Sequence, residues 1–369
     1  MLSFVLVIAP LIFVHELGHY FVARWFGIKA DTFSIGFGRE IAGWTDRRGT
    51  RWKVGWLPIG GYVKFAGDMN AASQPSSDWL TMPAEERARM FAAKPVWQRF
   101  LVVAAGPVTN FIFAIAILIG FILAFGEPRT PPLVASVQHG SAAEAAGLRA
   151  GDTITRIGGV RIDRFEDIAR QVVLRPGEPL KVEGTRLGRA FSVVARPRPD
   201  VQRDTFGNQY TRGLLGIGGS GVTMVKVSPA GALSGSVRMT WDMVAMTVEG
   251  VGQMIRGTRS VSELGGPLKI AKLSGEQASL GPVAYFWLLA VFSINLGFIN
   301  LLPVPMLDGG HLLFYAIEAV RRRPLKPEAQ EWAFRTGLAA LLALMIFVTI
   351  NDLASFGLWS KLGGLIGWA

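Results

Sequence analysis

Two histidines and a glutamate near the N-terminus have the types and spacing of a metal-dependent hydrolytic site. His15 and His19 are four residues apart, so on a helix they lie on one face, where both imidazoles can bind one ion. Glu16 projects beside them and can accept a proton from a metal-activated water. The pattern His-Glu-x-x-His is typical of zinc hydrolases. The sequence therefore predicts a catalytic metal site, and the alternative is a polar patch on a signal peptide or a helix end.

A third ligand must come from elsewhere, because catalytic zinc usually has three protein ligands and one open position. The chain has no cysteine, so this ligand must be a histidine or a carboxylate. The carboxylates beside apolar segments are Asp308, Glu318 and Asp352. Asp308 is favoured, because Pro303 and Pro305 break the helix before it, and irregular backbone at membrane depth is tolerated where it lines a cavity. His311 is the rival ligand, and a plain turn outside the membrane is the alternative.

The composition indicates a membrane protein. The chain has 369 residues, of which 50% are hydrophobic, and its mean hydropathy is +0.35, which suits several membrane helices and one soluble domain. The net charge of +11 raises the possibility of nucleic-acid binding. The basic residues, however, sit beside apolar runs, as in the cytoplasmic loops of membrane proteins. We therefore expect the lipid bilayer as a partner and no nucleic acid.

Four apolar segments are long enough to span a bilayer: residues 1–28, 98–126, 282–310 and 331–351. The first is expected to remain uncleaved, because no basic residue precedes its apolar core and no small-x-small cleavage site follows it. Basic residues begin at Arg24 and gather at 321–323, which predicts that the loops 67–97 and 311–330 are cytoplasmic and both termini are outside. The tail 352–369 has no predicted location.

A different periodicity follows the first apolar segment. Residues 31–66 alternate as strands do at 33–38 and 51–56, which predicts a hairpin, with a further strand after Gly60 and Gly61. One interpretation is a small cytoplasmic sheet, and the other is a sheet that dips toward the active site and pairs with an extended substrate. Under the second interpretation the candidate substrate contacts are Trp52, Val54, Trp56, Gly60 and Gly61. In the loop that follows, residues 83–93 form a short helical pattern.

Asn110 is a single amide inside the second apolar segment. An intramembrane amide usually either bonds to a neighbouring helix or lines a polar cavity, and the sequence leaves both readings open. In the second case Asn110 is a candidate substrate contact.

Residues 131–220 are soluble in composition, with strand patterns at 133–137, 153–157 and 191–194 and a helix at 165–173. The segment 143–152 resembles the PDZ domains of bacterial proteases. The later segment 213–217 looks like the loop with which PDZ domains bind a peptide carboxylate, which makes Leu214, Leu215, Gly216 and Ile217 candidate peptide contacts. Its position near the end implies a circularly permuted domain. The region 222–280 is amphipathic and fits either a surface-lying helix or a packed one.

Three motifs and the PDZ-like domain together resemble a known family. The motifs are HELGH at 15–19, GPVTNF at 106–111 and NLLPVPMLDG at 300–309. They resemble bacterial site-2 proteases of the regulator-of-sigma-E type, which are intramembrane zinc metalloproteases. The resemblance implies that His15, His19 and Asp308 bind Zn²⁺, that Glu16 is the general base and acid, and that Asn300 holds the substrate or the developing oxyanion.

The same resemblance implies a cellular role. The expected location is the bacterial inner membrane, with the PDZ-like domain periplasmic and the active site toward the cytoplasmic half. The expected substrates are single-span membrane proteins such as an anti-sigma factor, cut after a first extracytoplasmic cleavage, with the hairpin clamping the unwound substrate. This chain has one PDZ-like domain where the best-known members have two, which leaves the screening of substrates open.

The predicted fold is a polytopic α-helical membrane protein with four transmembrane helices, a membrane-associated β-hairpin and an inserted extracytoplasmic α+β PDZ domain. Two other functions compete with proteolysis. A metal transporter also places His and Asp inside the membrane, and a catalytically silent scaffold would bind peptides through the PDZ-like domain. Neither needs Glu16, so both predict that Glu16→Gln leaves function intact.

Overall fold

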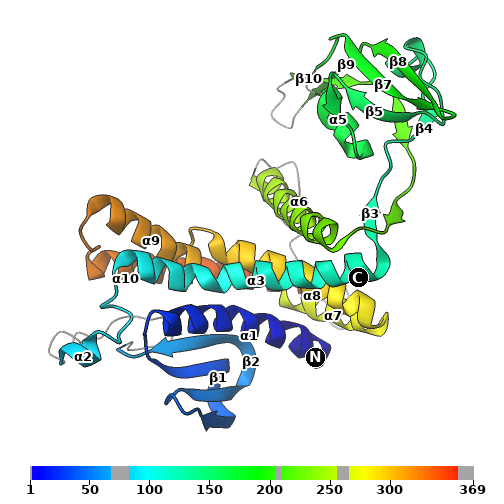
Figure 1. The fold of residues 1–369 in the computed structure, drawn as a ribbon. Helices are drawn as coiled ribbons and strands as arrows, with labels where there is room; N and C mark the ends of the chain where they lie inside the picture. The colour runs from blue at the N-terminus through cyan, green and yellow to red at the C-terminus, as the bar shows by residue number, and fades with distance from the viewer. Residues whose placement is uncertain (1, 68–82, 174, 204–208, 256–265, 356–369) are drawn as a thin grey trace, which may run out of the picture. The chain divides into compact units, whose positions relative to one another are not determined.

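The computed structural model describes residues 2–67, 83–173, 175–203, 209–255 and 266–355 (Figure 1). The chain divides into two compact units, which are described separately. The first comprises residues 1–118, 236–250 and 260–369, and the second comprises residues 119–235 and 251–259.

Four helices in the described residues are long and apolar enough to cross a membrane. They are α1 (Leu2–Trp25), α3 (Val96–Phe125), α8 (Pro282–Leu301) and α10 (Pro327–Ser355). Only 17% to 33% of each apolar window is buried inside the protein, so most of its side chains are left to face lipid. The prediction of four spans is thereby confirmed.

The third span ends at the predicted helix break. Helix α8 ends at Leu301, because Pro303 and Pro305 cannot donate backbone hydrogen bonds, and a new helix, α9 (Asp308–Arg321), begins after a short turn. Within the region 282–310 the span is therefore the part before these prolines, as predicted, and the predicted loop 311–330 is largely helical. Helix α2 (Ala84–Arg87) is shorter than the helical pattern at 83–93.

Strands β1 (Ala30–Thr45) and β2 (Arg51–Phe65) form the predicted hairpin, which lies against α1 (Figure 1). Both strands are longer than predicted, and β2 continues through Gly60 and Gly61, so the predicted additional strand is its last part. Both strands also bend. Residues 51–54 pair with 42–45 on one side and with 32–35 on the other, and 32–35 pairs in turn with 61–65. The hairpin is thus folded back on itself, and among the described residues the segment 61–65 forms one edge of the sheet.

The region after the inserted domain contains β12 (Thr223–Val225), α6 (Pro229–Ile255) and α7 (Pro267–Ser279). Within the first unit, Met239, Met243 and Val244 of α6 pack against a small core between α3 and α8. The sequence left open whether this amphipathic region forms a surface-lying helix or a packed one. The part of α6 that carries these three residues is packed.

The second unit contains a four-stranded antiparallel sheet of order β6-β5-β7-β8. Its strands are β5 (Thr153–Ile157), β6 (Val160–Arg161), β7 (Leu180–Arg186) and β8 (Arg189–Ala195). Helices α4 (Ala142–Ala145) and α5 (Phe165–Val173) share one apolar core with the sheet. The bounds predicted for the strand at 153–157 and the helix at 165–173 are confirmed.

Three two-stranded pairs complete the second unit. β4 (Val134–Val137) pairs with β11 (Ile217–Gly219), and β9 (Arg198–Arg203) pairs with β10 (Gln209–Leu214). β3 (Glu127–Arg129), which follows α3, pairs with β12, which precedes α6. The two chain connections to the inserted domain therefore run side by side.

Candidate metal centre

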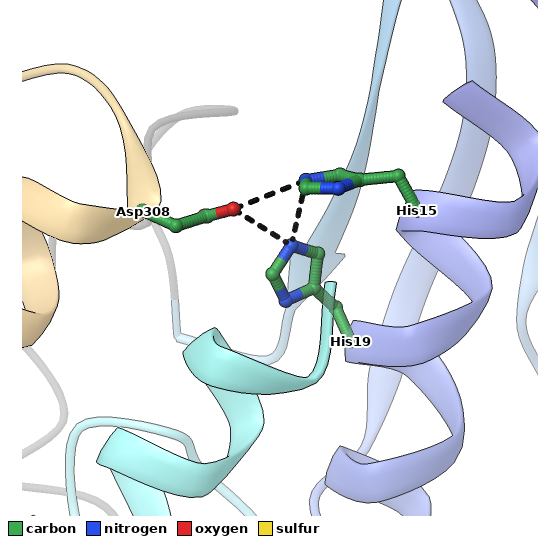
Figure 2. Close-up of side chains that lie close together, drawn as sticks. All are labelled: His15, His19 and Asp308. Atoms are coloured by element: carbon green, nitrogen blue, oxygen red, sulfur yellow. Dashed lines mark hydrogen bonds and ion pairs between the residues drawn. The ribbon is translucent and has the colours of Figure 1, made fainter. Parts of the chain in front are cut away.

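Three side chains from two distant parts of the sequence converge in the first unit. His15 and His19 project from one face of α1, and Asp308, the first residue of α9, points at both (Figure 2). The Oδ2 atom of Asp308 lies 3.1 Å from His15 Nε2 and 3.6 Å from His19 Nε2. The two Nε2 atoms are 3.2 Å apart. Among the described residues, these three are the group of His and carboxylate side chains that could hold one ion.

The protonation pattern of this group calls for a cation at its centre. His19 Nδ1 donates to the carbonyl oxygen of Val102 at 2.9 Å, so in the neutral imidazole the lone pair is on Nε2. That lone pair faces Asp308 Oδ2, a buried oxygen without a hydrogen-bond partner in the described structure. Two imidazole nitrogens and one carboxylate oxygen suit zinc.

Close packing of α1 and α3 makes room for the imidazoles. A Cβ atom at Gly18 would collide with the carbonyl oxygen of Ala105, so α1 approaches α3 through this glycine. A Cβ atom at Gly106 would collide with the His19 ring and lie 2.9 Å from His15 Cε1. In the sequence, the only sign of this close packing is the Gly106-Pro107 step inside an apolar segment. No role for Gly106 was predicted from it.

A tight turn before α9 places Asp308 next to the two histidines. Met306 has a φ of +81°, which is strained for a residue with a side chain and is the kind of outlier found at functional sites. A Cβ atom at Gly309 would collide with the carbonyl oxygens of Leu301 and Leu302, and one at Gly310 would lie 2.9 Å from the Cα atom of Pro305. Because neither glycine has a side chain, α9 can begin in close contact with the backbone at the end of α8.

A cavity of about 500 Å³ opens at the three ligands. Other residues from the sequence predictions that line it are Glu16, Gly60, Gly61, Asn300 and His311. Glu16 is 9% exposed, and its Cγ atom lies 3.2 Å from where a Cβ atom of Gly61 would be, so this edge of β2 runs beside it. The cavity thus brings together a carboxyl group, three side chains that could hold one ion, and a strand edge.

The other hairpin candidates lie elsewhere. Trp52 stacks against Phe33 with ring centroids 4.3 Å apart and donates from Nε1 to Asp46 at 3.0 Å, which makes it part of the packing of the sheet. Val54 and Trp56 are exposed and are not among the residues that line the cavity.

The remaining ligand candidates have partners of other kinds. Glu318 accepts from Arg99 at 3.0 Å and from the backbone of Leu325 at 3.1 Å. Asp352 accepts from three backbone N–H groups at the start of α7, those of Gly266, Leu268 and Lys269. The His311 ring lies 5.0 Å from the Phe334 ring, and His311 is outside the convergent group.

Asn110 has the first of its two predicted environments, a bond to a neighbouring helix. Its side chain is fully buried, and its amide nitrogen lies 3.1 Å from His15 Nδ1. It is not among the residues that line the cavity.

The PDZ candidates lie together in the second unit. Leu214 ends β10, Gly216 has a φ of +75° that forms the turn, and Ile217 begins β11. The Leu215 side chain is 3% exposed and packs in the core of the unit, so only its backbone can reach a peptide.

Comparison with known proteins is consistent with this geometry. The family model of peptidase family M50 matches residues 3–344. The chain is 44% identical to a zinc metalloprotease of Agrobacterium fabrum, over 95% of both chains. It is 42% identical to a zinc metalloprotease of Rhizobium meliloti, again over 95% of both chains. It is 37% identical to the metalloprotease MmpA of Caulobacter vibrioides, over 99% of this chain and 98% of that protein.

Proposed function

The chain belongs to peptidase family M50, the site-2 proteases, and from this membership we propose which of its residues carry out zinc-dependent proteolysis in the membrane. His15, His19 and Asp308 hold the zinc ion, and Glu16 is the general base and acid. The observation that carries this assignment is the buried, unpartnered Oδ2 atom of Asp308, which faces the Nε2 atoms of both histidines.

When bound, zinc polarises the substrate carbonyl and lowers the pKa of a water molecule toward about 7. Glu16 then takes a proton from the attacking water as the new C–O bond forms at the carbonyl carbon. The same carboxyl group gives that proton to the leaving amine as the C–N bond breaks. Asn300, at the end of α8 and on the cavity wall, donates from its amide to the oxygen on which negative charge develops.

The substrates we propose are single-span membrane proteins, such as an anti-sigma factor that a first extracytoplasmic cut has shortened. A membrane helix hides its carbonyls in hydrogen bonds, so it must unwind before it can be cleaved. The edge of β2 at residues 61–65 would replace the lost bonds by pairing with the extended segment, and Gly60 and Gly61 line the cavity there.

We further infer a location in the bacterial inner membrane, with the PDZ-like domain periplasmic and the active site toward the cytoplasmic half. The basic residues 321–323, between α9 and α10, support a cytoplasmic position of that connection. The turn at 214–217 would take the carboxylate of a shortened substrate.

The test uses the purified full chain in detergent with a single-span anti-sigma-type substrate. We expect cleavage that a zinc chelator abolishes and that Glu16→Gln abolishes, while the variant keeps its bound zinc. The control is His139→Gln, which changes an exposed histidine of the second unit and leaves cleavage intact. Cleavage that persists in Glu16→Gln would refute the proposed role of Glu16, whereas a wild-type chain that cleaves no substrate would favour a transporter or a scaffold.

A further inference from the structure

A stripe of three positions on α3 serves the two histidines of α1. Val102, Gly106 and Asn110 are spaced by four residues, so they lie along one face of the helix, as do His15 and His19 on α1. The carbonyl of Val102 accepts from His19, Gly106 leaves room for both rings, and Asn110 reaches His15. We propose that Asn110 is a positioning residue that fixes the tautomer and orientation of His15 for zinc binding, an inference that rests on the proposed function.

Asn110 is held firmly in this place. Its side chain is 0% exposed, and its backbone carbonyl accepts a hydrogen bond from Ser293 Oγ of α8 at 2.8 Å. Its amide group contacts His15 Nδ1 at 3.1 Å, while its Oδ1 atom is buried without a partner among the residues described. A buried amide oxygen that makes no bond costs free energy, so its presence requires an explanation.

The requirements of zinc decide which end of the amide faces the ring. If the NH₂ group faces Nδ1, then Nδ1 is an acceptor, the ring proton is on Nε2, and the nitrogen that faces Asp308 cannot bind a metal. The two ends of an amide have nearly the same shape, so a rotation of 180° exchanges them in place. Oδ1 then accepts from Nδ1–H and frees the Nε2 lone pair.

The equivalent interaction at His19 supports this reading. There the acceptor is the carbonyl of Val102, which cannot donate, so His19 presents its Nε2 lone pair to the site. Metal-binding histidines almost always donate their second ring N–H to such an outer partner. At the level of His15 the group of α3 that contacts the ring is the side-chain amide of Asn110, whose oxygen can be the acceptor that the Val102 carbonyl is for His19.

The test measures metal binding by the full chain in detergent after removal of bound metal. Zn²⁺ affinity is read by competition with a fluorescent chelator, and Co²⁺ is used as a probe whose visible absorption reports coordination geometry. Asn110→Leu keeps the number and branching of the side-chain heavy atoms but has no acceptor, and Asn110→Ala removes the amide. We expect both to bind Zn²⁺ about 10- to 100-fold more weakly than the wild type.

Asn110→Asp is the rescue variant. Its carboxylate can accept from His15 Nδ1–H, so we expect its Zn²⁺ affinity to stay above that of Asn110→Ala and its Co²⁺ spectrum to resemble that of the wild type. A purely structural role predicts the reverse order, because a buried carboxylate fits an apolar helix packing worse than alanine does. Ser293→Ala is the matched control, since it removes a buried hydrogen bond to the backbone of Asn110 and touches no imidazole.

The outcomes separate the two proposals. A wild-type chain that binds no zinc refutes the proposed function itself. A wild-type chain that binds zinc, with Asn110→Ala or Asn110→Leu binding equally well, overturns the role of Asn110 and leaves the proposed function standing. If Asn110→Leu does not fold, the comparison of Asn110→Asp with Asn110→Ala still decides, and a weaker Asn110→Asp contradicts the inference.

Discussion

Each unit of the chain has an aspartate with a buried carboxylate oxygen, and the two aspartates are bonded in opposite ways. In the inserted domain, Asp152 is 0% exposed and is fully bonded: Arg186 donates to both of its oxygens at 2.6 and 2.8 Å, and the backbone N–H of Arg149 donates at 2.8 Å. In the membrane unit, Asp308 Oδ2 has imidazole nitrogens in front of it but no hydrogen-bond donor among the described residues. A closed network stabilises a fold, whereas an open one leaves room for a ligand.

The same contrast exists among the carboxylates of the membrane unit. Glu318 forms a buried ion pair with Arg99 and accepts from a backbone N–H, and Asp352 accepts from the N–H groups that begin α7. Both hold helices together. Position along the chain made all three carboxylates candidates for the third ligand, and the helix-breaking prolines favoured Asp308. Their bonding partners in the structure now separate Asp308 from the other two.

The largest effect is expected from Asp308→Ala. Removal of a ligand should remove the zinc, and since the metal contributes several kcal/mol to the stabilisation of developing charge, cleavage should fall by about 1,000-fold or more. The measurements are bound zinc by atomic emission and the initial rate of substrate cleavage. Glu318→Gln is the control: it breaks a buried pair and lowers thermal stability, but the folded protein keeps its zinc. If Asp308→Ala retained its zinc and Glu318→Gln lost it, Glu318 and not Asp308 would be the carboxylate that binds the metal.

A smaller loss is expected from Gly106→Ala. The new methyl group collides with the His19 ring, so the imidazole must shift and weaken its bond to Val102. We expect zinc affinity to fall at least about 10-fold, which is the smaller of the losses found when a metal-binding histidine loses its hydrogen-bond partner. Gly120→Ala is the matched control on the same helix, because a Cβ atom there meets no described heavy atom within 4 Å. Equal zinc affinity of the two variants would show that α3 does not shape the site.

Asn110 and Gly106 also show which features of the site can be predicted from the sequence and which cannot. The spacing of His15 and His19, the apolar segments and the helix Phe165–Val173 follow from local patterns, and the structure bears out the four spans and the bounds of that helix. The partner of Asn110, 95 residues away, and the closeness of Gly106 to two imidazoles depend on how α1 packs on α3. Periodicity carries no information on such contacts.

The hairpin likewise combines features that the sequence predicts with features that depend on long-range packing. Alternation of apolar residues predicted two strands, but their bends depend on positions such as Gly36 and Gly38, whose φ angles are +86° and +84°. Because the bends bring residues 32–35 between two parts of β2, Trp52 becomes a packed residue and the edge at 61–65 faces Glu16. Long-range pairing of this kind cannot be read from an alternating pattern.

Asp152→Asn should affect only the inserted domain. Burial alone would raise the pKa of Asp152, but the hydrogen bonds from Arg186 and Arg149 hold it below its usual value. The stabilisation is therefore complete above the ordinary carboxyl pKa of about 4 and is lost as the pH falls through the lower, folded-state value. Hydrogen exchange of peptides from 131–200, corrected for intrinsic rates, should show protection that declines with acid in the wild type.

In Asp152→Asn the same peptides should exchange faster at neutral pH, and their protection should depend much less on acid. Zinc affinity at neutral pH should match that of the wild type, because the variant changes no group of the metal centre. A loss of zinc from this variant would contradict the division of the two aspartates into a structural one and a ligand.

Within the cavity, the smallest effect on metal binding is expected from His311→Phe. Burial lowers the pKa of the His311 imidazole, which is therefore neutral at neutral pH, and its ring packs 5.0 Å from Phe334 and 6.4 Å from Tyr315. Phenylalanine preserves this aromatic packing on the cavity wall. Because His311 stands outside the convergent group, zinc affinity should change by less than the roughly 10-fold that the loss of an outer partner costs. Competition with a fluorescent chelator measures this change, and if His311→Phe lost its zinc while Asp308→Ala kept it, the third ligand would be His311.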